Sequence, residues 1–344
     1  MRPARTALVA GCAAAALAAA GGSPALAATA SGGLEYCTGS DVCRYFPNPR
    51  LRVTFIAAPG EVNDVSGATS ASAVRIRDAI ATVTPGTSCK SIDPHEVECG
   101  PPGPEGMLVE VLTGDLADTV HLGFASRTGL GPDDDAGLGS SQPDLAFGES
   151  GNDRLLGRAG DDTLAGGGGD DQVDGDAGND QLEGDVGRDR LLGNSGSDRL
   201  SGGRSADRLA GGDGGDRVFG AGGGDRLSGG DGGDRLLGQT GDDRILGGGD
   251  DDRLSGGDGR DLLLGGWGAD RLAGAGGPDR LAGGSGDDRL NGGSGRDRFG
   301  GAAGRDFIDA ADGLRERVSC GSGRDRVIAD RSDRLIGCER IDFR

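Results

Sequence analysis

Residues 211–237 consist of GGDGGDRVF, GAGGGDRLS and GGDGGDRLL, three consecutive copies of one nine-residue unit. The unit repeats without a change of register over residues 148–309, which makes eighteen copies. Every copy has glycine at position one, aspartate at position six and Leu, Val, Ile or Phe at position eight. Position four is glycine in all copies except those with Ser205 and Asp250. Because nine residues cannot bury an apolar side chain alone, the copies are expected to stack as a solenoid.

The residue types within a unit favour two kinds of backbone. Positions one to six are mostly glycine and aspartate, which favour turns because glycine tolerates positive φ. Nine copies lack glycine at position two, and Asp176, Asp185 and Asn194 are tolerable there because Asp and Asn reach left-handed conformations. The last three residues, usually Arg-Leu-x, predict a short extended segment whose middle side chain points inward. Each unit is therefore predicted to be a turn followed by a very short strand.

The turn residues supply oxygen donors for a metal ion. Glycine lets backbone carbonyl groups converge, and the aspartate at position six adds a carboxylate. Oxygen donors suit a hard cation such as calcium, whereas the unit offers no nitrogen or sulfur donor for zinc or copper. The candidate metal ligands are Asp153, Asp162, Asp171, Asp180, Asp189, Asp198, Asp207, Asp216, Asp225, Asp234, Asp243, Asp252, Asp261, Asp270, Asp279, Asp288, Asp297 and Asp306.

On these residues the chain resembles the hemolysin-type calcium-binding (RTX) repeat family, whose consensus is G-G-x-G-x-D-x-U-x with U a bulky apolar residue. The resemblance covers residues 148–309, nearly half of the chain. It implies a right-handed parallel β-roll in which two units form one coil and calcium lies between successive loops on each edge. It also implies that the eighteen aspartates are ligands, together with backbone carbonyl groups. Nine coils would span roughly 43 Å at about 4.8 Å per coil.

The array has little apolar surface to hold it folded. Burying one leucine contributes about 1.5–3 kcal/mol, which is small beside the entropy lost when nine glycine-rich residues become ordered. The loop carboxylates also repel one another. Calcium would offset both effects, so we expect metal binding and folding to be one event. The alternative, a disordered low-complexity linker, is disfavoured by the strict period and the constant apolar position.

The charge of the chain limits its partners. The net charge is −20, and the eighteen units contain 33 acidic and 19 basic residues. Such an acidic, aromatic-poor surface does not attract nucleic acid or anionic membranes in the absence of metal. Arginine occupies position seven in thirteen units. Stacked coils would align these arginines in rows on the outer face, where they either pair with spare carboxylates or bind an anionic polymer.

The N-terminus predicts export from the cell. Residues 1–27 have a basic start, an alanine-rich apolar run at residues 7–20 and a small-residue site at residues 25–27. This is the pattern of a secretory signal peptide, cut after residue 27. No other segment has the length of a membrane span.

Two cysteines near the C-terminus predict a disulfide. An even number of cysteines, six, follows the signal peptide, which indicates disulfides in an exported chain. Cys320 and Cys338 are eighteen residues apart, one full coil of the roll that the resemblance implies, and would stack about 4.8 Å apart. The sequence between them is one last imperfect coil that carries Asp325 and Asp333. Residues 310–344 are therefore predicted to be a disulfide-stapled cap that closes the roll.

Residues 28–147 are predicted to be a β-rich segment that leads into the roll and caps it. Residues 114–120 resemble a decayed unit, Asp144 fits one unit upstream of Asp153, and residues 128–142 are interpreted as a loop. Alternating apolar and polar residues predict strands at residues 51–57, 73–77, 96–99, 108–112 and 119–122. The pairing of the remaining cysteines is open, and a hairpin closed by Cys89–Cys99 and a small loop closed by Cys37–Cys43 are two possibilities.

The sequence offers little sign of catalysis. It has neither the HExxH motif of zinc proteases nor the GxSxG nucleophile elbow. Its only histidines, His95 and His121, are predicted to be surface or strand residues rather than catalysts. Trp267, at position three of its loop, could stack on a sugar, but an exposed side chain without function is the simpler prediction. A hydrolase with an unrecognised site in residues 28–147 stays an alternative.

These observations together predict an all-β, secreted calcium-binding protein that is not an enzyme and whose only cofactor is calcium, bound at several sites. One possible role is a structural or matrix component whose rod stiffens where extracellular calcium is plentiful. The other is an extracellular adhesin or binding module that recognises a surface polymer or protein. The predicted parts are residues 1–27, 28–147, 148–309 and 310–344: signal peptide, N-terminal β segment, roll and cap.

Overall fold

The computed structural model describes residues 135–139, 141 and 143–344 in full, and it describes strands β1–β9 by their backbone. The chain divides into two compact units, Met1–Ser140 and Ser141–Arg344, which we describe separately. Within the described part of the chain, no helix is long and apolar enough to cross a membrane.

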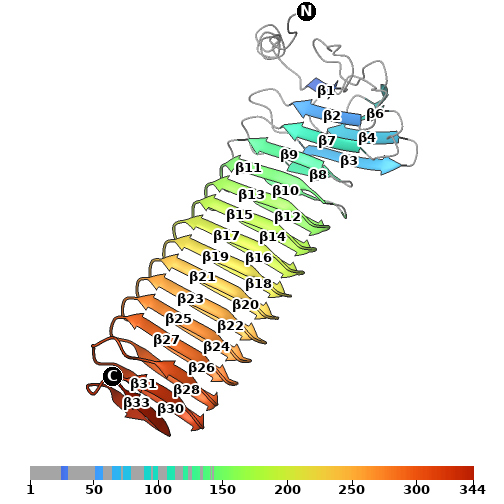
Figure 1. The fold of residues 1–344 in the computed structure, drawn as a ribbon. Coiled ribbons are helices and arrows are strands. Elements are labelled where there is room, and N and C mark those ends of the chain that lie inside the picture. The colour runs from blue at the N-terminus through green and yellow to red at the C-terminus, as the bar shows by residue number, and fades with distance from the viewer. Residues whose placement is uncertain are drawn as a thin grey trace, which may run out of the picture. The chain divides into compact units, whose positions relative to one another are not determined.

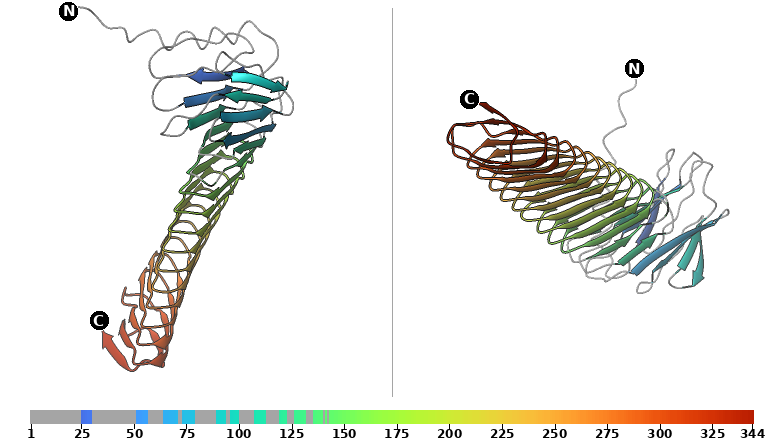
Figure 2. Two further views of the ribbon diagram at one scale, coloured as in Figure 1. Left: turned by 90° about the vertical axis from the view of Figure 1, so that its right-hand side faces the viewer. Right: turned by 90° about the horizontal axis from the view of Figure 1, so that it is seen from below.

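The second unit is a parallel β-solenoid of about eleven coils (Figure 1). Successive strands alternate between two sheets, one made of odd-numbered and the other of even-numbered strands. Each strand pairs in parallel with the strand one coil later, as Arg208 pairs with Arg226 and Arg199 with Arg217. Two further views show the strands stacked along one axis with turns on both edges (Figure 2). The predicted all-β parallel roll is therefore confirmed.

The strands of this unit are nearly uniform, and most have six residues. The odd-numbered strands are β11 (Leu145–Ser150), β13 (Thr163–Gly168), β15 (Gln181–Val186), β17 (Arg199–Arg204), β19 (Arg217–Gly222), β21 (Arg235–Thr240), β23 (Arg253–Asp258), β25 (Arg271–Gly276), β27 (Arg289–Ser294), β29 (Phe307–Asp309), β31 (Arg326–Ala329) and β33 (Arg340–Phe343). The even-numbered strands are β12 (Arg154–Ala159), β14 (Gln172–Ala177), β16 (Arg190–Ser195), β18 (Arg208–Asp213), β20 (Arg226–Asp231), β22 (Arg244–Gly249), β24 (Leu262–Trp267), β26 (Arg280–Ser285), β28 (Arg298–Gly304), β30 (Arg317–Gly323) and β32 (Arg334–Ile336).

Each strand is longer than the sequence predicts. A strand comprises positions seven to nine of one unit and positions one to three of the next, as in β12. The prediction of only three extended residues per unit is wrong, because hydrogen bonding between coils continues beyond the glycine at position one. At the end of the strand, for example, Gly151 N donates to Gly168 O at 2.7 Å. The turn is consequently confined to positions four to six.

Left-handed backbone at positions two and four forms the bends at the edges. The nine non-glycine residues at position two all have φ between 70° and 78°. Ser205 and Asp250 at position four have φ of 84° and 71°, so their loops keep the turn without glycine. At Gly241, also at position four, an added Cβ would overlap the carbonyl of Gly223 in the preceding coil. Close stacking of the coils therefore explains why glycine dominates this position.

The core of the roll is a single apolar side chain per strand. Every position-eight residue of the array is at most 4% exposed, and Leu191, Leu200 and Leu236 are fully buried. Positions seven and nine point outward and positions six and eight point inward, as the alternating burial of β18 and β20 shows. The inward neighbours of each apolar residue are the aspartate at position six and the glycine at position one of the next unit.

The first unit contains ten strands among its described segments. They are β1 (Ala25–Thr29), β2 (Leu51–Ile56), β3 (Asp64–Ser70), β4 (Ala73–Asp78), β5 (Cys89–Asp93), β6 (Glu96–Cys99), β7 (Met107–Leu112), β8 (Thr119–Leu122), β9 (Ser126–Gly131) and β10 (Ala136–Leu138). The five predicted strands correspond to β2, β4, β6, β7 and β8, within one residue at each end. The predicted loop at residues 128–142 is partly wrong, because β9 pairs with β7 and β10 with β8. Pairing with a neighbouring strand outweighs the turn-rich local composition.

The remaining predictions for this unit are tested only in part. Strands β5 and β6 form an antiparallel hairpin in which Cys89 lies opposite Cys99, as the hairpin prediction requires. Cys37 and Cys43 lie outside the described residues. So does the predicted signal peptide, apart from the three residues that begin β1.

The C-terminal end of the roll carries the predicted disulfide. Cys320 and Cys338 are bonded, with a Cα–Cα distance of 5.2 Å and a separation of eighteen residues. The final strands β30 to β33 continue both sheets in parallel register. The last imperfect coil that the sequence predicts is therefore present and covalently closed.

Candidate metal sites

All eighteen predicted ligand residues are buried in the roll. The position-six aspartates, from Asp153 to Asp306, have relative exposures of 0–3%. They form two columns, because position six immediately precedes each strand. Aspartates that precede odd-numbered strands form the odd column on one edge, and those that precede even-numbered strands form the even column on the other edge. The structure thus gathers residues that are spread over half of the sequence into two rows of carboxylates.

Hydrogen bonds between coils fix these carboxylates in place. In each column, the backbone N–H of one aspartate donates to Oδ1 of the aspartate eighteen residues later. Asp207 N donates to Asp225 Oδ1 at 2.9 Å, and Asp216 N donates to Asp234 Oδ1 at 2.8 Å. Since the carboxylates from Asp162 to Asp306 receive the same bond at Oδ1, the remaining oxygen of each is the equivalent atom, Oδ2, along both columns.

The second carboxylate oxygen is buried without a hydrogen-bond partner in most units. These fifteen Oδ2 atoms belong to Asp162, Asp180, Asp189, Asp198, Asp207, Asp216, Asp225, Asp234, Asp243, Asp252, Asp261, Asp270, Asp279, Asp288 and Asp306. Among the residues that the structure describes, none of these fifteen aspartates forms an ion pair with a basic side chain. A buried, unpaired carboxylate oxygen is unfavourable unless a proton or a cation accompanies it. The columns therefore offer repeated oxygen donors to a positive ligand.

The glycine at position one leaves open the space that these oxygens face. If Gly184 carried a Cβ, that atom would lie 2.5 Å from Asp189 Oδ2 and 2.6 Å from the Gly202 carbonyl oxygen of the next coil. Similar overlaps with the position-six carboxylate occur at position one throughout the array. The carboxylate and the carbonyl oxygen thus pack directly against the glycine, so position one has room for the buried carboxylate only without a side chain.

Burial raises the pKa of the aspartates in both columns. Loss of solvation is the largest cause, and repulsion from neighbouring carboxylates raises the pKa further. The backbone hydrogen bond to each carboxylate acts in the opposite direction and lowers the pKa. The pKa is raised to about 7 for Asp162, Asp207, Asp234, Asp252, Asp279 and Asp288. The pKa is raised to about 6 for Asp180, Asp189, Asp198, Asp243 and Asp261. These carboxyl groups are therefore ready to exchange a proton for a metal ion near neutral pH.

A second, outer row of hydrogen bonds was not predicted from the sequence. At position five, a side-chain oxygen accepts the backbone N–H of the residue one coil later, as Asp242 does from Arg260 at 2.9 Å. Asp170 also forms an exposed ion pair with Arg188, and Asp287 forms one with Arg305. Exposed pairs of this kind add little stability. Their signal in the sequence is the frequent Asp or Asn immediately before position six.

The donor set and the fold agree with the match to known families. The family described as RTX calcium-binding nonapeptide repeat (4 copies) matches overlapping segments that together cover residues 131–308. The chain belongs to this family. The match spans just over half of the 344 residues and extends upstream of the regular array. No curated protein matches the chain.

RTX repeats bind calcium, and the fully described part of this RTX chain fits that ion. The donors are oxygens only, they repeat at each coil, and their Oδ2 atoms are buried without a hydrogen-bond partner. Asp144 and Asp325 extend the odd column by one residue at each end, because Asp144 N donates to Asp162 Oδ1 and Asp306 N donates to Asp325 Oδ1. Trp267, predicted to be exposed in a loop, is 73% exposed but is the last residue of strand β24.

Proposed function

We propose that the eighteen position-six aspartates bind calcium between successive coils and that, at neutral pH, the roll folds only when these sites are filled. The observation that supports this proposal most strongly is the set of fifteen buried Oδ2 atoms. They have neither a hydrogen-bond donor nor an ion-paired basic side chain. Adjacent carboxylates of a column lie one coil apart, so two ionised neighbours would repel each other by roughly 3 kcal/mol at 4.8 Å and an effective dielectric constant of 20. Bound calcium supplies the positive charge that offsets this repulsion.

The biological role that we propose is a secreted, non-enzymatic structural or matrix component. The cap disulfide and the signal-peptide pattern of residues 1–27 support an extracellular location, because disulfides persist in oxidising compartments. In this proposal residues 148–309 are the calcium-dependent roll, residues 310–344 cap it, and residues 28–147 form the N-terminal β segment. Calcium is plentiful outside the cell, so the roll would stay unfolded until export.

Calorimetry on matched variants tests the calcium sites. Asp216→Asn keeps the shape and the Oδ1 acceptor but removes the charge of a buried carboxylate, so fewer calcium ions should bind per chain. Asp213→Asn makes the same change at an exposed residue, the last of β18, and should leave the number unchanged. Absence of calcium binding at millimolar concentration, or equal stoichiometry in the two variants, would refute the assignment.

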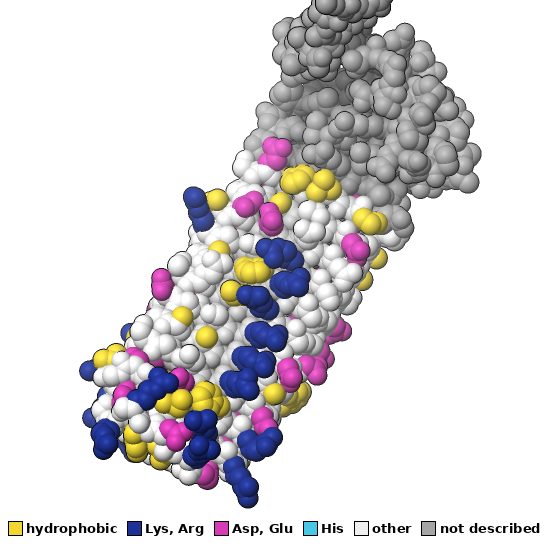
Figure 3. Space-filling model, viewed as in Figure 1, with side chains coloured by type: hydrophobic (Ala, Val, Ile, Leu, Met, Phe, Trp, Pro, Cys, Tyr) yellow, Lys and Arg dark blue, Asp and Glu magenta, His cyan; other side chains and the backbone are white. Residues whose placement is uncertain are grey.

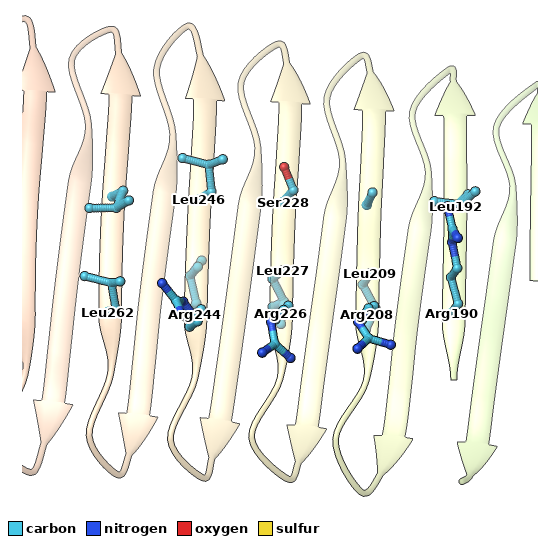
Figure 4. Close-up of a pocket in the computed structure, with 13 residues that line it drawn as sticks. Arg190, Leu192, Arg208, Leu209, Arg226, Leu227, Ser228, Arg244, Leu246 and Leu262 are labelled. Atoms are coloured by element: carbon cyan, nitrogen blue, oxygen red, sulfur yellow. The ribbon is translucent and has the colours of Figure 1, made fainter. Parts of the chain in front are cut away.

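A second candidate function, binding of an anionic surface polymer, is favoured by the outer face of the even-numbered sheet. Arg208, Arg226 and Arg244 lie in register on successive strands, and none of them forms an ion pair. Figure 3 shows a row of basic side chains along one face of the roll, and Figure 4 shows these three arginines beside the outward side chains of Leu192 and Leu246. Stacked, unpaired guanidinium groups attract anions.

Retention on immobilised heparin in saturating calcium tests this second function. Replacing Arg208, Arg226 and Arg244 together by glutamine should lower the salt concentration needed for elution. The matched control replaces Arg217, Arg235 and Arg253 of the other sheet, which removes the same charge from a different face. Equal effects of the two triple variants would indicate attraction to net charge alone, and no retention of the unaltered chain would exclude the function for this probe.

A further inference from the structure

The cap contains a group of carboxylates that differs from the repeat columns. Asp312, Glu316 and Asp330 each place a carboxylate oxygen within 4.8 Å of the other two. The family match ends at residue 308, so this group lies beyond the recognised repeats. Its three ligands would all be side chains, whereas an array site has one carboxylate beside backbone carbonyl oxygens.

A local change in register creates this group. Arg317 pairs with Arg298, so Glu316 is the counterpart of Asp297 in the even column, but the two are nineteen residues apart instead of eighteen. The loop before Glu316 therefore contains one additional residue. Glutamate also has one more methylene group than aspartate, and its carboxylate does not accept the backbone N–H that each position-six aspartate of the column takes from the preceding coil.

Glu316 is the decisive member of the group because its charge has no protein partner. The residue is 1% exposed, and neither Oε1 nor Oε2 has a hydrogen-bond partner. None of the ion pairs found among the described residues involves it. The side chain beside it is another acid, because Glu316 N donates to Asp333 Oδ1 at 3.0 Å. A buried carboxylate without a donor or cation is strongly unfavourable when ionised.

The other two carboxylates are held in place by backbone N–H groups. Asp312 accepts hydrogen bonds from Leu314 N at 2.8 Å and Gly295 N at 2.9 Å, and Asp330 accepts one from Gly313 N at 2.6 Å. These bonds fix both side chains on loops of adjacent coils, and each carboxylate places an oxygen within 4.8 Å of one from Glu316. The group is thus preorganised, and its charge is only partly neutralised.

We propose that Asp312, Glu316 and Asp330 form a separate binding site for a hard divalent cation, of the calcium class, that ties the last loops of the roll together. Three carboxylates without nitrogen or sulfur donors favour calcium or a similar ion. The site adjoins the loop of the last even-column unit, since Gly295 N donates to Asp312, but it uses a different donor set and lies beyond the matched repeats. Together with the disulfide, it would hold the final coil at the open end of the solenoid.

Terbium luminescence in the full chain tests this site. Terbium replaces calcium and emits strongly when a nearby indole transfers energy to it. Leu314→Trp places an indole next to the site on a residue that is already 42% exposed, and Trp267→Phe removes the native indole. We expect sensitised emission from this double variant, and calcium should compete with terbium and reduce it. Adding Glu316→Gln should lower the emission at least tenfold at subsaturating terbium, since removal of a ligand weakens metal binding by tenfold or more.

Asp234→Asn in the same double variant is the matched control. Asp234 is a buried carboxylate in the middle of the array, so its loss should reduce the total number of bound ions and leave the sensitised emission unchanged. The experiment can therefore reject the cap site without rejecting the repeat sites, and the reverse. Absence of sensitised emission from the folded reporter chain, or emission unaffected by Glu316→Gln, would overturn the proposal.

Should the reporter chain fail to fold, a terbium-soaked crystal of the unaltered protein decides the question. An anomalous-scattering peak between Asp312, Glu316 and Asp330 would support the site. No peak there, with peaks in the repeat loops, would show that Glu316 is simply a protonated buried acid.

Discussion

Replacing Gly184 by alanine should damage both the packing of the roll and one of its metal sites. The new methyl carbon would lie 2.5 Å from Asp189 Oδ2 and 2.6 Å from the Gly202 carbonyl oxygen. Carbon and oxygen atoms rarely approach closer than 3.0 Å, so each oxygen must retreat by about half an ångström. The carbonyl belongs to the backbone of the next coil, and therefore the coils themselves must separate locally.

Overpacking of this kind typically costs about 1–3 kcal/mol. We expect the free energy of unfolding of Gly184→Ala in saturating calcium, measured by urea titration and circular dichroism, to fall by at least that amount. Calorimetry should also show fewer bound calcium ions. Gly300→Ala is the matched control, because a Cβ at Gly300 meets no atom within 4 Å and should change stability by less than about 1 kcal/mol. Equal stability of the two variants would refute the view that position one is kept open for the carboxylate.

Three further predictions concern protonation, the core and the cap. Because eleven of the column carboxyl groups have pKa values raised to about 6 or 7 in the calcium-free roll from an ordinary value of 3.8, the calcium-free fold should be most stable below about pH 4 and lose stability as the pH rises through 6–7. Circular dichroism in excess chelator should accordingly gain β signal from pH 8 to pH 5, and a loss of signal would contradict the assignment. Leu191→Ala should lower the free energy of unfolding in calcium by about 2–5 kcal/mol, whereas Leu192→Ala, whose side chain points outward, should change it far less. Similar urea midpoints of the two variants would argue against a core made of one apolar side chain per strand. Reducing the Cys320–Cys338 disulfide should speed amide hydrogen exchange in β30–β33 and leave the middle of the roll protected, because a solenoid is stabilised by neighbouring coils; a uniform loss of protection would count against this.

The sequence predicts the solenoid because its period is strict. Aspartate at position six and an apolar residue at position eight occur in all eighteen units, so the stacking of the units and the inward side chain at position eight could be assigned without a structure. The eighteen-residue coil also predicts the Cys320–Cys338 pairing. Strand length was less predictable, because glycine at positions one to three favours turns by composition while hydrogen bonds between coils keep these residues in the ladder.

Other features of the sites depend on geometry that a sequence does not express. The bond from each aspartate N–H to Oδ1 of the next aspartate arises only when coils stack in register. Glu316 could not be predicted from the repeat, because one additional loop residue displaces it from the eighteen-residue period. Its burial, which distinguishes it from the many exposed acidic residues of the chain, becomes visible only in three dimensions.

The central claim is that calcium is part of the folded core. Its most direct test is a calcium titration of the full chain at pH 7.5, followed by far-ultraviolet circular dichroism and starting in excess chelator. We predict a disordered spectrum without calcium for residues 148–309 and a cooperative gain of β structure as calcium is added. A β spectrum that is already complete in excess chelator and unchanged by calcium would contradict the claim.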